Sequence, residues 1–256
     1  MNRPLIVAHR GSSARAPENT LAAFQVAIDD GAEGVEFDVH LAKDGVPVVV
    51  HDDDLRRTGM RPGRVTNLTS SELGELDVGS WFNVKHPDLA NPEFSKQTVP
   101  TLIETLDLLK DFDGLIYVEL KCDEWNCVDL VTAVCGVIRD APQLSQIIIK
   151  SFKLGAIPEV RHLLPDAKTA ALFAPEIMVF LRRREHIIAL AREFGADQLS
   201  VHYSLVTPRL CKLAAEAKMP LTVWTVDDPL WLARRANLDI RAVITNDPSV
   251  FRLLTI

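Results

Sequence analysis

Short apolar runs rich in β-branched residues alternate with segments of helical periodicity along nearly the whole chain. Such runs are typical of buried strands, and the spacing between them is typical of amphipathic helices. The pattern predicts strands at residues 5–8, 34–41, 115–120, 147–151, 168–172, 198–201, 221–224 and 242–245. It predicts helices that begin near residues 20, 103, 128, 157, 183, 208 and 229, with a short last helix after Pro248.

Two of the predicted helix starts carry clear cap chemistry. Thr207 and Asp228 each precede a proline, so a capping residue is followed by proline at the first helical position. Eight strands alternating with eight helices in about 250 residues fit a closed TIM (β/α)8 barrel. An open doubly wound sheet is the alternative, but the glycine fingerprint expected after its first strand is absent. We therefore predict one α/β barrel domain over residues 1–256.

The alternation is first interrupted after the second strand, where Asp44-Gly45 separates two apolar runs. Asp-Gly flanked in this way is a strong hairpin signal. A two-residue turn at these positions would place Asp38 directly opposite His51, on the same face of the hairpin. The hairpin therefore predicts that a histidine lies beside an acidic residue of the second strand.

The alternation of strands and helices is interrupted a second time at residues 52–100. Thr69 and Glu72 have the spacing of a capping box, which predicts one short helix. Trp81 and Phe82 are expected to anchor this segment rather than to touch a ligand. Long insertions after a barrel strand usually form lids or binding loops. We expect a small inserted subdomain that covers the mouth of the barrel.

Net charge, cysteine spacing and the length of apolar stretches argue against several classes of function. The chain carries a net charge of −7 with dispersed basic residues, which argues against nucleic-acid or anionic membrane partners. The sharpest basic cluster, residues 182–184, is expected to be a solvated helical face. The four cysteines lack C-x-x-C spacing, so zinc is not expected, and dispersed reduced thiols fit a cytosolic setting. No apolar stretch is long enough for a signal peptide or a membrane span, so a cytoplasmic location is predicted and the oligomeric state stays open.

Candidate chemistry gathers where the predicted strands end, because the C-terminal ends of barrel strands meet at one face. Glu36 and Asp38 are two residues apart and leave their strand on the same side, and the same holds for Glu119 and Lys121. The polar residues at the ends of the first three strands are His9, Arg10, Glu36, Asp38, Glu119 and Lys121. Later strands end at Lys150 with Ser151, at Trp224 and at Asn246.

Three carboxylates in one pocket raise each other's pKa unless some protonate or a cation lies among them. Arg10 and Lys121 offset part of the charge, but an all-oxygen cluster suits a hard divalent ion. Mg²⁺ or Ca²⁺ is favoured over Zn²⁺. His9 and His51 would then be free to act as a general acid and a general base. This set of groups suits a reaction at an anionic phosphorus centre.

Each of these residues taken singly has a simpler structural interpretation. His9 could be a satisfied core histidine, and Glu119 with Lys121 could be a local ion pair. The agreement of five separate strand-end segments favours an active site instead. Trp224 could be core packing or could stack on substrate, and we take it as a substrate-binding candidate. The other histidines are expected to be exposed along the hairpin, inactive at the barrel rim, or on the surface: His40, His202, His86, His162 and His186.

Eight motifs occur in order between about residue 5 and residue 250: AHRG, PENT, GVEFDVHLAKDGVPVVVHD, VPTL, VELK, KSF, VWTV and ITNDP. This ordered set resembles the glycerophosphodiester phosphodiesterase family, and in particular its cytosolic members. The resemblance implies a TIM barrel with a small insertion after the second strand. It implies metal-dependent hydrolysis of small-molecule glycerophosphodiesters, such as glycerophosphocholine or glycerophosphoethanolamine, to sn-glycerol 3-phosphate and an alcohol.

The resemblance also implies roles for individual residues. Glu36, Asp38 and Glu119 would bind one divalent cation, His9 and His51 would be the acid–base pair, and Arg10 with Lys121 would hold the phosphate. The glycerol 2-hydroxyl would attack phosphorus, and water would open the cyclic intermediate. The chain departs from the family where the last motif, often T-D-x-P, has Asn246 in place of the aspartate.

Two other functions stay open at this point. The same fold could act as a lysophospholipase D or sphingomyelinase D-type enzyme with a longer hydrophobic entrance. A non-catalytic barrel that binds a phosphorylated ligand is the second alternative, although a binder would not need two proton-transfer groups.

Overall fold

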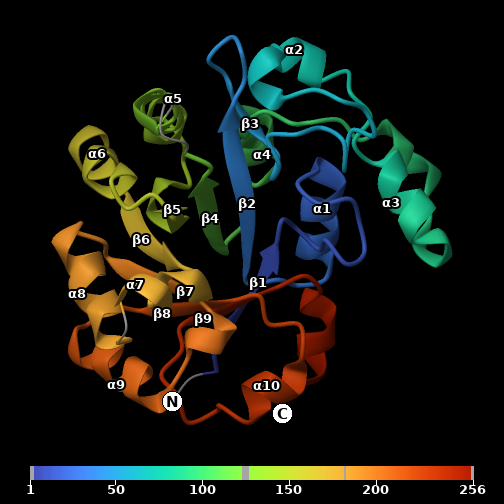
Figure 1. Cartoon of the computed structure of the whole chain (residues 1–256). Helices are drawn as coiled ribbons and strands as arrows, with labels where there is room; N and C mark the ends of the chain where they lie inside the picture. The colour runs from blue at the N-terminus through green and yellow to red at the C-terminus, as the bar shows by residue number, and fades with distance from the viewer. Residues whose placement is uncertain (1–2, 123–126, 182, 255–256) are drawn as a thin grey trace.

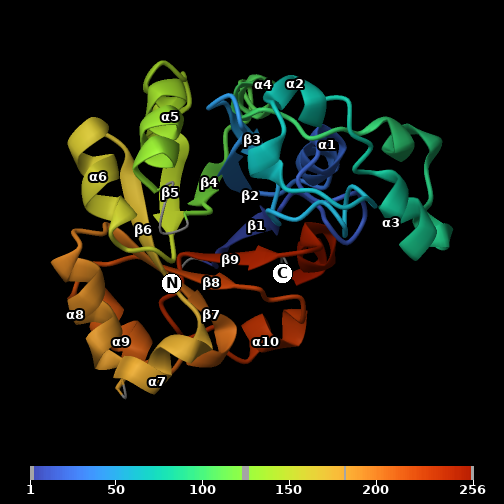
Figure 2. The ribbon, with the colours of Figure 1, turned by 45° about the horizontal axis from the view of Figure 1, so that its top comes forward.

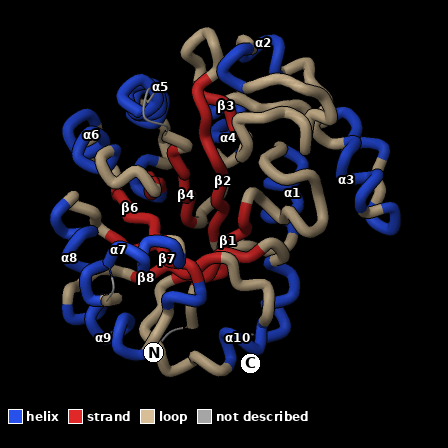
Figure 3. The backbone as a smooth tube through the Cα atoms, viewed as in Figure 1, coloured by secondary structure: helices blue, strands red, loops and turns tan. Residues whose placement is uncertain are grey.

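Eight parallel strands close into a barrel in the computed structural model, which describes residues 3–122, 127–181 and 183–254. Neighbouring strands follow the order β1, β9, β8, β7, β6, β5, β4, β2, and β2 pairs back with β1. Figure 3 shows the strands gathered at the centre, with the helices around them. The bounds are β1 Leu5–His9, β2 Gly34–Leu41, β4 Leu115–Leu120, β5 Ile147–Ser151, β6 Lys168–Phe173, β7 Gln198–His202, β8 Leu221–Trp224 and β9 Ala242–Thr245. The predicted TIM barrel is confirmed.

The helices lie outside the barrel, between successive strands (Figures 1 and 2). Apart from α7, which was not predicted, their first residues fall within two positions of the predicted starts, and the side chains of Thr207 and Asp228 cap α9 and α10 as predicted. Only the last segment differs in type, because it is a 3₁₀ helix at Pro248–Leu254. The helices are α1 Leu21–Asp29, α4 Leu102–Leu108, α5 Cys127–Arg139, α6 Ala156–Leu163, α7 Met178–Leu181, α8 Glu185–Glu193, α9 Pro208–Glu216 and α10 Pro229–Ala233.

Apolar side chains fill the part of the barrel interior away from the strand ends that carry the site. Val7, Tyr117, Ile148 and Ile244 form a buried cluster there, and Tyr117 Oη lies 2.9 Å from Thr222 Oγ1. Two larger apolar layers pack between the barrel wall and the surrounding helices. Because this interior is filled, polar chemistry is confined to the C-terminal ends of the strands.

The hairpin is confirmed, but its predicted register is wrong by one residue. β3, at Pro47–Val49, pairs antiparallel with β2 so that His40 faces Val48. The loop holds three residues instead of two, because Gly45 has a φ of +79° and its N–H bonds the carbonyl of Ala42. Asp38 is therefore opposite Val50, and His51 lies beyond the end of β3.

The segment between β3 and α4 has short helices and apolar clusters of its own. It holds α2 at Ser70–Leu73 and α3 at Ser80–Lys85, and the predicted capping box of Thr69 and Glu72 is present at α2. Phe82 is fully buried against Phe94. Figures 1 and 2 both show this segment to one side of the barrel, beside α1.

No helix among the described residues is long and apolar enough to cross a membrane. Arg183 and Arg184 are exposed near the start of α8, as expected, whereas residue 182 lies outside the described residues. The cysteines are less dispersed than predicted, since the Sγ atoms of Cys122 and Cys127 are 2.8 Å apart.

Candidate active site

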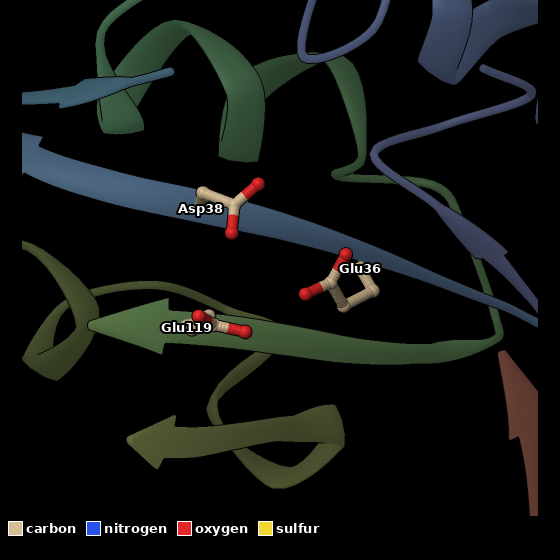
Figure 4. A group of neighbouring side chains, drawn as sticks. All are labelled: Glu36, Asp38 and Glu119. Carbon is tan, nitrogen blue, oxygen red and sulfur yellow. The ribbon is translucent and has the colours of Figure 1, made fainter. Parts of the chain in front are cut away.

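Three carboxylates converge at the ends of two neighbouring strands. Glu36 and Asp38 project from β2, and Glu119 projects from β4, where it is in register with Asp38. All three are buried, and each offers an oxygen within 4.8 Å of the oxygens of the others. Figure 4 shows the carboxylates turned toward a shared space. The structure thus brings together the three acidic residues that the sequence singled out.

Lysines from two strands bracket this cluster. Lys121 Nζ lies 2.9 Å from Asp38 Oδ1 and also pairs with Glu119. Lys150, at the end of β5, places Nζ 2.8 Å from Glu36 Oε1 and 3.4 Å from Glu119 Oε2. Lys150 lies at a predicted strand end, without a predicted role. Lys150 is in register with Glu119 on the adjacent strand, and this pairing emerges only in the folded barrel.

Two residues of the loop after β1 complete the surroundings of Asp38. Arg10 Nε lies 3.2 Å from Asp38 Oδ2, and Asn19 Nδ2 donates a hydrogen bond of 2.9 Å to the same oxygen. Arg10 and Gly11 both have positive φ, and a Cβ at Gly11 would lie 2.5 Å from the backbone of Ala23. This tight turn holds the Arg10 side chain over the carboxylates. Asn19 was missed because its motif, PENT, shows no pairing partner in the sequence.

The local charges keep Glu36 and Asp38 ionised. Burial alone would raise the pKa of Glu36, but the Lys150 ammonium outweighs it and lowers that pKa. Burial likewise opposes ionisation of Asp38, yet Lys121, Arg10 and then His51 hold its pKa well below the ordinary value. Burial would lower the pKa of both lysines, but the carboxylates raise it. Three negative groups therefore face three positive groups, and the cluster is close to neutral as a whole.

His9 ends β1 and lies between the carboxylates and β9. Its Nδ1 is 2.6 Å from Asn246 Oδ1, and its Nε2 is 3.9 Å from Glu36 Oε2. Burial lowers the pKa of His9 more strongly than the Glu36 charge raises it, so the ring is neutral near pH 7. A neutral imidazole next to an acidic cluster can accept a proton.

His51 follows the hairpin and is held by a chain of ion pairs. Its Nδ1 lies 2.6 Å from Asp52 Oδ1, and Asp52 Oδ2 accepts a hydrogen bond of 2.6 Å from Arg57 Nε. Arg57 also binds both oxygens of Glu18, and Glu18 accepts a further hydrogen bond from Arg10. This network links the inserted segment to the loop after β1. It places His51 near Asp38 despite the shifted register.

The remaining histidines depart from expectation in two places. His40 is buried instead of exposed, because its Nε2 bonds the carbonyl oxygen of His51 at 2.9 Å. His86 is half-buried and packs on Phe82 with 4.6 Å between ring centroids. His162 and His186 are exposed as predicted.

Aromatic rings line the opposite rim of the site. Trp224 ends β8 and makes edge contacts with Phe152 and His202, at centroid distances of 5.6 and 5.2 Å. Phe152 is 44% exposed and Tyr203 is 43% exposed. Trp224 Nε1 is buried and has no hydrogen-bond partner among the described residues. The rim therefore offers apolar surface beside the charged cluster.

The donor set fits a hard divalent cation. All three candidate ligands offer carboxylate oxygens, which Mg²⁺ and Ca²⁺ prefer. Glu36 Oε1 is buried and makes no hydrogen bond of good geometry within the described part of the chain, although Lys150 is close. An oxygen of this kind retains a lone pair for a cation.

Comparisons with known proteins agree on one family. The model of the glycerophosphoryl diester phosphodiesterase family matches residues 9–250. A glycerophosphodiester phosphodiesterase of Caldanaerobacter subterraneus is 31% identical over 96% of this chain and 95% of its own length. The "probable glycerophosphodiester phosphodiesterase 1" of Mycobacterium tuberculosis is 45% identical over 88% of this chain and 82% of its own length.

The solved structures agree with this result. An Oleispira antarctica phosphodiesterase in complex with the product sn-glycerol 3-phosphate superposes with a TM-score of 0.86 and 27% identity. The match covers 98% of this chain and 96% of that chain. The protein therefore belongs to the glycerophosphoryl diester phosphodiesterase family and is an enzyme of that class.

Proposed function

We propose that the enzyme hydrolyses glycerophosphodiesters to sn-glycerol 3-phosphate and an alcohol, with one divalent cation held by Glu36, Asp38 and Glu119. The observation that carries the proposal is the close approach of three buried carboxylates, flanked by His9 and His51. The product bound to the Oleispira antarctica relative supports the same reaction. The segment of residues 52–100 is proposed to form a cap beside this site.

With a divalent cation bound, the net charge of the site would match an anionic substrate. Arg10, Lys121 and Lys150 already offset the three carboxylates, so a bound divalent ion gives the site a positive excess. A phosphodiester monoanion, and the charge that grows on its oxygens during attack, would compensate that excess. When bound, Mg²⁺ or Ca²⁺ would polarise the phosphoryl group and favour ionisation of the attacking hydroxyl.

The protein's own side chains supply the remaining functions. Arg10 and Lys121 are the cations with exposed surface at the cluster, each with 18% of its side chain accessible, and we assign them to the phosphate. His9 and His51 transfer protons as the glycerol 2-hydroxyl attacks phosphorus and the alcohol leaves. Water then opens the cyclic diester, with the proton transfers reversed.

The aromatic rim favours a second candidate substrate class. Phe152 and Trp224 offer apolar surface that a small polar alcohol would not need. A diester with an acyl chain on its glycerol, such as a lysophospholipid, would cover that surface. This activity is that of a lysophospholipase D, and it uses the same cation site and the same histidines.

The test is a ³¹P NMR assay on glycerophosphocholine, glycerophosphoethanolamine and lysophosphatidylcholine, with Mg²⁺, with Ca²⁺ and with excess chelator. We expect sn-glycerol 3-phosphate from the first two substrates, only with metal, and loss of turnover in His9→Ala and His51→Ala. His162→Ala, on an exposed histidine of α6, is the matched control and keeps full activity. A metal-loaded enzyme that leaves all three substrates intact contradicts the proposal, and conversion of the lysophospholipid alone favours the second candidate.

A further inference from the structure

We propose that Asn246 and Asp227 are positioning residues that hold His9 with its proton on Nδ1 and its Nε2 lone pair toward the carboxylate cluster. This inference rests on the proposed function, because it specifies how His9 enters the reaction. It also accounts for the amide at position 246, where the family motif often has an aspartate.

The orientation of the Asn246 side chain is fixed from the side away from His9. Its Nδ2 lies 2.7 Å from Asp227 Oδ2, and a carboxylate can only accept, so the amide NH₂ must face Asp227. Oδ1 therefore faces His9 Nδ1 at 2.6 Å and also accepts from Ser13 Oγ at 3.0 Å. A flipped amide would set Oδ1 against the carboxylate, where two acceptors would meet with no proton between them.

Asp227 is itself held in place by other donors. Its Oδ1 accepts from the backbone N–H of Asn246 at 2.8 Å and from Thr245 Oγ1 at 3.0 Å. Both oxygens are thus occupied by residues at the end of β9. The Asp227 carboxylate cannot turn away without breaking these hydrogen bonds. Because it is fixed, it also fixes the orientation of the Asn246 amide.

The amide in turn selects the tautomer of His9. A carbonyl oxygen carries no proton, so a hydrogen bond of 2.6 Å to His9 requires that Nδ1 be the donor. A neutral imidazole has one N–H, so Nε2 then carries the lone pair. Nε2 is also the nitrogen nearest the carboxylates, 3.9 Å from Glu36 Oε2. The opposite tautomer would bring two acceptors together at the Asn246 contact.

This tautomer gives His9 a defined part in the first step. The O–H bond of the attacking hydroxyl breaks, and its proton forms a bond to His9 Nε2. The oxygen electron pair forms the new bond to phosphorus, and the alcohol leaves with the electrons of the broken P–O bond and a proton from a second group. His9 accepts the proton, and His51, doubly protonated with its Nδ1–H toward the Asp52 carboxylate, donates the second proton from Nε2.

The experiment combines kinetics with ¹⁵N NMR of histidine-labelled protein. In the unaltered enzyme we expect a protonated Nδ1 and an unprotonated Nε2 on His9. Asn246→Leu removes the acceptor, so a mixture of tautomers should appear and kcat should fall about 10- to 100-fold, the usual range for a partner of this kind. KM should change less than about twofold, because Asn246 does not hold the phosphate. Asn237→Leu, on an exposed asparagine after α10, is the matched control.

Exchanging the residues at positions 227 and 246 gives a second test, which applies even if Asn246→Leu does not fold. Asn246→Asp alone sets two carboxylates against each other, and Asp227→Asn alone frees the amide to turn, so both should be slower than the parent. The double variant Asp227→Asn/Asn246→Asp again offers His9 an acceptor and should recover most of the activity. An unchanged His9 spectrum in Asn246→Leu, or a double variant no better than its singles, overturns the inference. Absence of turnover in the parent enzyme would overturn the proposed function instead, while the spectrum would still report the tautomer.

Discussion

Lys150 Nζ lies 2.8 Å from Glu36 Oε1, and both side chains are almost fully removed from solvent. Removal of one partner from a buried ion pair leaves an uncompensated charge. We expect Lys150→Met to lower the free energy of unfolding in chelator by about 3 to 5 kcal/mol. Added Mg²⁺ or Ca²⁺ should recover part of this loss, because the cation would replace the missing ammonium charge.

Urea unfolding with and without metal measures both effects. Lys168→Met, at the exposed start of β6, is the matched control and should change the stability by less than about 0.5 kcal/mol. Equal stabilities of Lys150→Met and the control would show that Lys150 does not compensate the cluster.

Glu18 connects Arg10 of the barrel with Arg57 of the inserted segment. Burial would raise the pKa of Glu18, but the hydrogen bond from Arg57 and the charge of Arg10 lower it below 4.5. A lowered native pKa contributes stability that is complete above pH 4.5 and is lost as the pH falls through the native value. Glu18→Gln should therefore cost about 2 kcal/mol at pH 7, and the difference from the parent should shrink below pH 4.5.

Chemical unfolding at several pH values measures this difference. Glu193→Gln, on an exposed glutamate at the end of α8, provides the reference. A Glu18→Gln effect of constant size down to pH 3 would mean that the carboxylate charge is not the source of the stability.

Asp52 selects the orientation of His51 in the same way that Asn246 is proposed to act on His9. In Asp52→Asn the amide oxygen must face the Arg57 donor, so the NH₂ would face His51 Nδ1. That nitrogen could then carry no proton, and the doubly protonated ring that donates from Nε2 would be lost. We expect kcat to fall about 10- to 100-fold with a smaller change in KM. Steady-state kinetics on glycerophosphocholine, with the partly exposed Asp54→Asn as control, provide the measurement. Full activity in Asp52→Asn would exclude this role.

Phe152 contributes exposed apolar surface beside Trp224. If the acyl chain of a lysophospholipid or another large apolar group covers this surface, Phe152→Ala should lower kcat/KM for such diesters by about tenfold, from the apolar area lost. The rate on glycerophosphoethanolamine should change less than about threefold. Val84→Ala on α3, also highly exposed, is the control. Equal losses on both substrates would show that the rim does not select for an apolar substrate group.

Much of the fold follows from local patterns in the sequence. The strand and helix starts could be predicted because periodicity and caps such as Thr207-Pro208 depend on neighbouring residues only. The pairing of Glu36 with Asp38 on one face follows from the alternation of a strand. These regularities also allowed the acidic cluster to be predicted.

Other features depend on contacts between distant parts of the chain. The hairpin register was wrong because one extra loop residue at Gly45 costs little locally yet shifts every pair that follows. Lys150 and Asn246 contact the site from strands far along the sequence, and their partners emerge only when the barrel closes. His40 was misjudged because its partner is a backbone carbonyl, which no sequence motif marks.

The central claim is that Glu36, Asp38 and Glu119 bind one divalent cation between β2 and β4. An anomalous difference map from a crystal grown with Mn²⁺, a stand-in for Mg²⁺, tests it most directly. We predict one strong peak within about 2.0 to 2.6 Å of an oxygen from each of the three carboxylates. A map with no peak among them, at a Mn²⁺ concentration that supports turnover, would contradict the account.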